Sequence, residues 1–448
     1  MKALVFMMKL KSEIQLLAKK YLAETIENRR YLHTYPELSF VEYTTSDYIS
    51  SKLKAYNIPF EQGIVKTGII AIIEGTKNKS SKEPVVDSNL ILQQQEEVVK
   101  NKKIMCVALR ADMDALPITE ENNVIYKSKN DGIMHACGHD VHSASLISTA
   151  KILNELKNEF EGIIKLIFQP GEEKLPGGAS LMIKEGVLEN PSPNSIFGQH
   201  VFPSMEVGKV GFRSGMYMAS TDEIYMTIYG KGGHAAMPSD YNNPLLIASQ
   251  ILLELHKKFM PTKVESPFNS TEHFKSDDKE SKRALPPTVL AFGKIEGKGA
   301  TNVIPKEVTI EGTFRTMDEN WRTKAHIKIK KIAEDIAIKM GGSCNIRIER
   351  GYPFLVNDID TTARARAAAE RYLGKENVED LPMRMTAEDF AFYSQKIPAC
   401  FYRLGTGNAA NGITSGVHTS KFDIDERALE ISSGLMAWLA INELANQK

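Results

Sequence analysis

Short apolar runs alternate with amphipathic stretches along most of the chain, as in α/β proteins. Four runs are almost continuously apolar and end at a polar or turn residue, so buried strands are predicted over residues 68–75, 104–109, 162–170 and 195–201. Apolar residues at helical spacing predict helices over 12–28, 42–56 and 142–157. The Tyr-Pro step within 29–40 predicts a loop there. This alternation predicts an α/β sheet with helices on both faces.

The pattern changes after Met216. Strands are predicted over 222–230, 288–296, 303–315 and 343–350, with helices over 244–259 and 321–340. This β-α-β-β-α-β order is typical of a ferredoxin-like domain. The α/β pattern resumes with a helix over 361–372, a strand over 400–404 and a final helix from Asp425. We therefore expect one α/β domain in two parts, 1–215 and 353–448, and an inserted α+β domain over 216–352.

Two polar segments interrupt these elements. Residues 77–103 are rich in Gln, Lys and Glu and lie between two predicted strands, so we expect a long hairpin or a mobile insert. Residues 262–283 are poor in aliphatic side chains and are predicted to be a disordered surface excursion. Neither segment is expected to contribute to a core.

Composition narrows the classes of partner. Lys+Arg and Asp+Glu both number 56, so no net charge attracts the chain to nucleic acid or to an anionic membrane. The sequence contains no run of eighteen apolar residues, so no membrane span is expected. The apolar stretch 3–8 is too short for a signal-peptide core. Only 4 cysteines in 448 residues favour a reducing compartment. A cytoplasmic protein with a small-molecule substrate is expected.

Residues 134–142 read MHACGHDVH and hold three of the ten histidines. Cys137 and His139 offer a thiolate and an imidazole, which are ligands that divalent transition metals prefer. A polar surface loop with titrating histidines is the alternative interpretation. A closed structural zinc site would need a second close Cys or His pair, and the sequence has none. The remaining ligands must therefore be distant in sequence, as in a catalytic site.

Other candidate ligands follow the predicted strands. Asp112 and Asp114 follow the strand at 104–109, Glu172 and Glu173 follow the one at 162–170, and His200 ends the run at 195–201. In α/β folds such positions gather at the carboxyl edge of the sheet, although Asp is also a common turn residue.

With His418, the candidate metal ligands are Cys137, His139, Glu173, His200 and His418. One ion in an open catalytic site normally takes fewer ligands from the protein, so two divalent metals are the better fit. Glu172 is then left as the general base.

These motifs together resemble the metal-dependent amidohydrolases of the aminoacylase/carboxypeptidase superfamily. The similarity is greatest to the branch of hippurate hydrolases, N-acyl-amino-acid amidohydrolases and plant indole-acetyl-amino-acid hydrolases. The matching stretches are 30–40, 109–118, 135–142, 168–173, 198–201, 230–238, 301–305, 386–390 and 417–422. The resemblance implies an α/β catalytic domain with a dinuclear metal site and an inserted ferredoxin-like lid domain.

The resemblance also implies roles for single residues. Asp114 matches the acid that orients a ligating histidine, and Asp112 stands where other branches carry a metal-binding histidine. His234 matches a lid histidine that approaches the scissile carbonyl. Asn302 and Arg315 match residues that hold the substrate carboxylate, although a turn Asn and a surface Arg would look the same in sequence. Cys137 stands where many relatives bridge the two ions with a carboxylate.

The implied activity is hydrolysis of the amide bond of an N-acyl amino acid, with zinc, manganese, cobalt or nickel as the metal. A dipeptidase or carboxypeptidase with the same site is the nearest alternative. A non-catalytic metal-bound binding protein is an alternative of another class, but such proteins usually lose a ligand or the base, and here none is missing. An exposed strand of the lid domain could pair across a homodimer.

Overall fold

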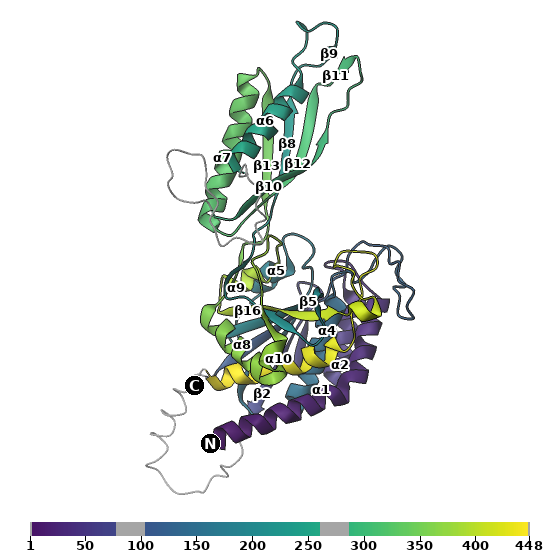
Figure 1. Cartoon of the computed structure of the whole chain (residues 1–448), viewed down its shortest axis with the longest axis vertical. Coiled ribbons are helices and arrows are strands. Elements are labelled where there is room, and N and C mark those ends of the chain that lie inside the picture. Colours follow the sequence, from purple (N-terminus) through teal and green to yellow (C-terminus); the bar gives the residue numbers. More distant parts are fainter. Residues whose placement is uncertain (1, 78–103, 260–285, 447–448) are drawn as a thin grey trace. The chain divides into compact units, whose positions relative to one another are not determined.

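The computed structural model describes residues 2–77, 104–259 and 286–446, which form two units (Figure 1). The first unit comprises Met1–Gly215, Asn357–Leu381 and Tyr393–Lys448, and the second comprises Met216–Val356 and Pro382–Phe392. Residues 382–392, which the sequence analysis placed with the α/β domain, group with the second unit. Apart from Lys77, the two polar segments expected at 77–103 and 262–283 lie outside the described residues.

An eight-stranded mixed sheet in the order β1-β2-β4-β3-β5-β16-β6-β15 forms the centre of the first unit. Its strands are β1 (Phe60–Ile64), β2 (Gly68–Thr76), β3 (Cys106–Asp112), β4 (Glu161–Gln169), β5 (Ser195–Glu206), β6 (Val210–Phe212), β15 (Val378–Asp380) and β16 (Ala399–Gly407). The four neighbouring strands β4, β3, β5 and β16 are parallel. Their carboxyl ends therefore meet at one edge of the sheet.

Helices pack along this sheet. They are α1 (Lys2–Thr34), α2 (Tyr43–Ala55), α4 (His139–Glu155), α5 (Gly178–Lys184), α8 (Ile359–Leu373) and α10 (Ala428–Asn446), and a further short helix, α9 (Ala391–Ser394), crosses the boundary between the units. Helices α1, α4 and α10 contact one another, and α4 and α10 also contact β3. None of the helices among the described residues has the length and apolar character needed to span a bilayer.

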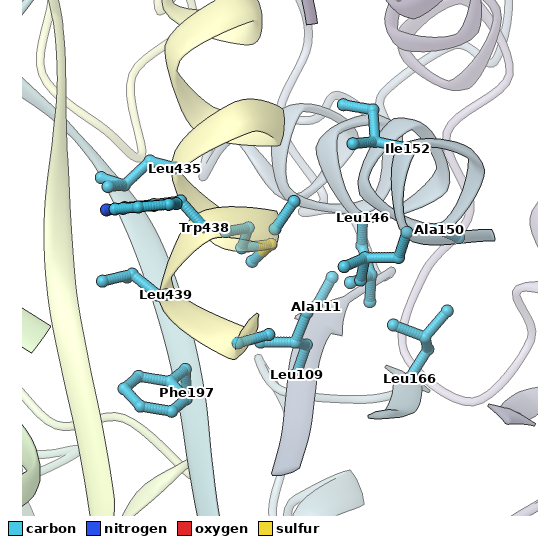
Figure 2. Packing of buried hydrophobic residues seen from close by; sticks show 14 of the residues in the cluster. Leu109, Ala111, Leu146, Ala150, Ile152, Leu166, Phe197, Leu435, Trp438 and Leu439 are labelled. Atoms are coloured by element: carbon cyan, nitrogen blue, oxygen red, sulfur yellow. The ribbon is translucent and has the colours of Figure 1, made fainter. Parts of the chain in front are cut away.

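The core of the first unit lies between the sheet and these helices. Figure 2 shows Leu109 and Ala111 of β3, with Leu166 of β4 and Phe197 of β5, in one buried cluster with Trp438 of α10. Because side chains alternate along a strand, Arg110 and Asp112 point to the face opposite Leu109 and Ala111. These polar side chains lie near the carboxyl end of β3, and every residue of this strand is buried.

The α/β prediction is confirmed, with local differences. Helix α1 continues to Thr34, although a loop was predicted from Arg29 onward. Pro36 restricts the residue directly before it, so the helix can extend to two residues before the proline. The short strands β1, β6 and β15 were not predicted, because runs of three to five residues carry little hydrophobic periodicity.

The second unit has the expected ferredoxin-like order. Its four-stranded antiparallel sheet runs β10-β12-β8-β13 and comprises β8 (Asp222–Tyr229), β10 (Thr288–Glu296), β12 (Glu307–Thr316) and β13 (Ser343–Arg350), with α6 (Pro244–Phe259) and α7 (Glu319–Lys339). The strand predicted over 303–315 is interrupted at Pro305, which cannot donate to a ladder. Residues before it form β11 (Val303–Ile304), paired with β9 (Gly233–His234). Outside both main sheets, β7 (Gly215–Met218) pairs with β14 (Leu355–Asn357).

A buried ion cluster joins β8 to α7 in the second unit. Asp222 has no exposed surface and accepts hydrogen bonds from Arg322 Nε at 2.9 Å and His326 Nε2 at 2.6 Å. Although burial opposes ionisation, hydrogen bonds from His326 and Arg322 lower the pKa of Asp222. Removing the carboxylate would leave a buried guanidinium without its main counter-charge.

We expect Asp222→Ala to destabilise the second unit by about 3–5 kcal/mol, the usual cost of breaking a buried ion pair. The chain has 2 tryptophans, so Trp321 fluorescence in a Trp438→Phe background reports urea unfolding of this unit. Asp335→Ala is the control, because Asp335 is exposed and pairs with exposed Lys331. Equal losses in the two variants would contradict the assignment.

Candidate metal centre

The loop that begins α4 holds Cys137 and His139 on either side of Gly138. Gly138 has φ 84°, which favours glycine, and a Cβ there would lie 2.6 Å from Val201 Cγ2. His139 is the first residue of α4, and both Cys137 and His139 are buried. The backbone conformation at Gly138 therefore allows the thiol of Cys137 and the imidazole of His139, on either side of it, both to be buried.

Carboxylates and a further imidazole come from the carboxyl ends of the parallel strands. Asp112 is the last residue of β3, and Glu172 and Glu173 follow the end of β4. His200 lies inside β5, which continues to Glu206. The pairing of β5 with β3 ends at Gly198, two residues before His200. His200 is therefore also at the edge where β3 has ended.

Asp114 is the structural centre of this edge. Its fully buried carboxylate accepts hydrogen bonds from His139 Nδ1 at 3.2 Å, Ser39 Oγ at 2.6 Å, and the backbone N–H groups of Glu172 at 3.0 Å and Glu173 at 2.9 Å. Although burial opposes ionisation, the hydrogen bond from His139 lowers the pKa of Asp114. An ionised Asp114 thus orients the candidate ligand His139 and the turn that carries Glu172 and Glu173.

Hydrogen bonds select the ring nitrogen that each histidine presents. His139 Nδ1 donates to Asp114, and His200 Nδ1 donates to the Val201 carbonyl at 2.8 Å. The lone pair of each neutral ring then lies on Nε2, as in histidine ligands whose other nitrogen is fixed by a carboxylate or carbonyl. His200 Nε2 lies 3.3 Å from Cys137 Sγ.

Two groups of three side chains share Cys137. Its sulfur lies within 4.8 Å of ligand atoms of His139 and His200 in one group, and of Glu173 and His418 in the other. His418, which is half exposed, places Nε2 3.2 Å from both Cys137 Sγ and Glu173 Oε1. The structure therefore brings all five sequence-predicted ligands together, in an arrangement able to hold two metal ions.

The donor atoms fit divalent cations. His139 Nε2 and Glu173 Oε1 are buried and have no hydrogen-bond partner among the described residues. Burial and the charges of Glu173 and Glu172 raise the pKa of Cys137, so a thiolate there needs a nearby positive charge. Divalent cations would supply that charge and bind the two unpartnered atoms.

The sequence analysis gave no role to His142, although it lies in the 134–142 motif, and none to Arg110. His142 Nδ1 lies 2.6 Å from Asp112 Oδ1, and its Nε2 accepts from the Val201 N–H at 3.0 Å. Arg110 Nη1 donates to Asp112 Oδ2 at 2.6 Å. Both nitrogens of His142 and both oxygens of Asp112 thus have protein partners, although Asp112 Oδ2 also lies 3.6 Å from His139 Nε2. The three-residue spacing of His139 and His142 in a helix was the available signal.

Three predicted residues belong to the second unit. His234 is in β9 and pairs with Val303 of β11, and Ala235 N donates to the carbonyl of Asn302 at 3.0 Å. His234 Nδ1 accepts from the Ala236 N–H at 3.1 Å, which leaves the proton of a neutral ring on Nε2. Arg315 lies on β12, and its Nη1 donates to the Met385 carbonyl at 3.1 Å.

Comparisons with known proteins agree with this chemistry. The model of Peptidase family M20/M25/M40 matches residues 108–441. An N-acetylcysteine deacetylase of Bacillus subtilis (strain 168) is 35% identical over 426 residues, covering 94% of this chain and 97% of that protein. Thermostable carboxypeptidase 2 of Saccharolobus solfataricus is 33% identical over 419 residues, covering 93% of this chain and 94% of that protein.

A solved structure from Bacillus subtilis, described as a dinuclear metal binding peptidase from the M20 family, superposes with a TM-score of 0.73 at 31% identity. The match covers 95% of this chain and 99% of that one.

We expect the cobalt-loaded protein to show a thiolate-to-cobalt charge-transfer absorption band that Cys137→Ser removes, because thiolate is a soft ligand that binds such ions directly. Cys106→Ser is the matched control, since Cys106 is equally buried but lies in β3 outside the candidate ligand groups. Absorption spectra and metal content measured together check this. Loss of the band in the control but not in Cys137→Ser would contradict the assignment.

Proposed function

Since the chain belongs to Peptidase family M20/M25/M40, whose members act on amides, we propose that it hydrolyses the amide bond between an acyl group and an amino acid. The observation that carries the proposal is the pair of three-ligand groups that share Cys137, with Glu172 in the same cluster as His139 and Glu173. A nucleophilic water and a carboxylate able to take its proton are what amide hydrolysis requires.

Cys137, His139, Glu173, His200 and His418 would hold two divalent cations. When bound, the cations supply polarisation of the scissile carbonyl and a lower pKa for the attacking water. The protein's own residues do the rest. Asp114 keeps the ring of His139 in one orientation and also receives the backbone N–H of Glu172. The base and a ligand are thus positioned by one carboxylate.

Glu172 is the proposed general base. It is buried, with 7% exposure, which excludes most competing water from its carboxylate. The carboxylate takes a proton as the water oxygen attacks the carbonyl carbon. Glu172 then gives this proton to the amide nitrogen as the C–N bond breaks, so that a neutral amine departs and a carboxylic acid is formed.

The peptidase alternative uses the same residues. One relative is named a deacetylase of an N-acetyl amino acid and another a carboxypeptidase, so both substrate classes occur among proteins of similar sequence. Turnover of N-acetyl, N-benzoyl and indole-acetyl amino acids, measured beside dipeptides and longer peptides, separates them. Preference for peptides would move the chain to the peptidase class without changing the roles of its residues.

We also propose substrate contacts for His234, Asn302 and Arg315. With Nδ1 occupied by the Ala236 N–H, a neutral His234 carries its proton on Nε2 and can donate to a developing oxyanion. Asn302 directly precedes β11 in the two-stranded sheet that β11 forms with β9, and a guanidinium such as that of Arg315 suits a substrate carboxylate.

The first prediction concerns the base. We expect Glu172→Gln to lower kcat by about 10²–10⁴-fold, the usual contribution of general acid-base catalysis, while two metals remain bound. Steady-state kinetics on the best N-acyl amino acid and elemental analysis of the same samples check this. Glu121→Gln, a change to an exposed glutamate outside the candidate ligand groups, is the control. Unchanged turnover with full metal content would remove Glu172 from this role.

The second prediction concerns the oxyanion. Loss of an oxyanion donor typically lowers kcat by about 10²–10³-fold, so we expect a loss of this size in His234→Ala with unchanged metal content. His256→Ala is the control, because His256 lies on α6 in the same unit. A change in KM alone would assign His234 to binding and not to the chemical step.

A further inference from the structure

The segment before α2 packs against the turn that carries Glu172 and Glu173. We propose that Glu42 is a positioning residue, which holds the backbone of Gly171 and through it sets the place of Glu172. This inference rests on the proposed function for its effect on turnover, but its structural part can be tested without turnover. The segment 30–40 was prominent in the sequence resemblance and had no assigned role.

The carboxylate of Glu42 is fully buried and accepts three hydrogen bonds. Its Oε1 accepts from the backbone N–H of Gly171 at 2.8 Å and of Phe40 at 2.9 Å, and its Oε2 accepts from Thr67 Oγ1 at 2.7 Å. Glu42 is the residue directly before α2, and its side chain caps none of the N–H groups of that helix. The buried carboxylate of Glu42 therefore does not cap α2 but accepts a hydrogen bond from the turn after β4.

Three successive backbone N–H groups in that turn point at buried carboxylates. Gly171 donates to Glu42, whereas Glu172 and Glu173 donate to Asp114. Consecutive N–H groups directed at anions form a concave arrangement that fixes the backbone on both sides. Without Glu42, the N–H of Gly171 would lose its acceptor, whereas those of Glu172 and Glu173 would keep Asp114.

Phe40 encloses the same turn. Gly171 has φ 61°, and a Cβ on it would lie 2.4 Å from Phe40 Cε1, so the aromatic ring lies directly against the glycine backbone. Ser39 of the same segment donates to Asp114 at 2.6 Å. One short segment thus contacts the turn through a ring and a carboxylate, and contacts Asp114 through a hydroxyl.

Glutamine is the conservative substitute for Glu42. It keeps the size and shape of the side chain and removes only the charge. The glutamine oxygen can still accept from Gly171 and Phe40, and its NH₂ group can donate to Thr67, whose hydroxyl can rotate to accept. Alanine removes all three contacts.

The test compares Glu42→Ala and Glu42→Gln in the metal-reconstituted full chain. An error in position of about 1 Å can cost about 10²-fold in rate, so we expect a kcat loss of this order in Glu42→Ala, with KM and metal content unchanged. Glu42→Gln should recover most of the wild-type kcat. Hydrogen-exchange mass spectrometry should show faster exchange in peptides containing residues 171–173 for Glu42→Ala only.

Glu443→Ala is the matched control for loss of a buried glutamate. Glu443 of α10 is 2% exposed and accepts from Arg364 Nε at 2.9 Å and Nη2 at 2.6 Å. It should lose stability with kcat and exchange at 171–173 unchanged. If Glu42→Ala leaves that exchange unchanged, or if Glu42→Gln is as slow as Glu42→Ala, the positioning role is wrong. Absence of turnover in the wild type would instead overturn the proposed function, while the exchange data still decide the role of Glu42.

Discussion

Burial of several carboxylates at one edge of a sheet is the constraint on which the rest of this site depends. An isolated buried carboxylate costs several kcal/mol, and the cost is offset only when donors or cations surround it. Arg110 and His142 compensate Asp112, and His139, Ser39 and two backbone N–H groups compensate Asp114. Glu173 Oε1 accepts no hydrogen bond from the described residues, although His418 Nε2 lies 3.2 Å from it. Asp112 and Asp114, which orient other side chains, thus have hydrogen-bond donors from the protein, whereas Glu173 Oε1 is an acceptor suited to a cation.

The elements that carry the site could be predicted because each is defined locally. Buried parallel strands are continuous apolar runs, so β3 and β4 could be located from the sequence pattern, and with them Asp112, Asp114, Glu172 and Glu173, although β3 ends at Asp112 and not at Leu109. Residues at the carboxyl ends of parallel strands must converge, whatever the details of packing. The ferredoxin-like order of the second unit was equally readable, since each element has its own period.

The supporting contacts could not be predicted, because they join residues that are far apart in sequence. Nothing in the sequence around Glu42 distinguishes it from a glutamate that caps a helix, yet its carboxylate lies on Gly171, 129 residues away. The same holds for Asp222 and Arg322, which are 100 residues apart. Periodicity reports which face of an element is buried, but not which buried polar group will meet which donor. The end of α1 was misplaced for a different reason, since Pro36 limits only the residue before it.

Hydrogen bonds to Asp112 and Asp114 also explain why His142 and His139 can differ in role although they are three residues apart in one helix. His142 has both nitrogens occupied, by Asp112 and by the Val201 N–H, so it acts as part of the scaffold. His139, three residues earlier in the chain, has one nitrogen fixed by Asp114 and the other without a partner among the described residues. The sequence motif contains both residues without distinguishing them, and only the hydrogen bonds of the second nitrogen separate a ligand from a support. The same criterion applies to His200, whose Nδ1 is fixed by a carbonyl and whose Nε2 faces Cys137. The proposed ligand roles of His139 and His200 therefore rest on Nε2 atoms that face other candidate ligands and not the scaffold.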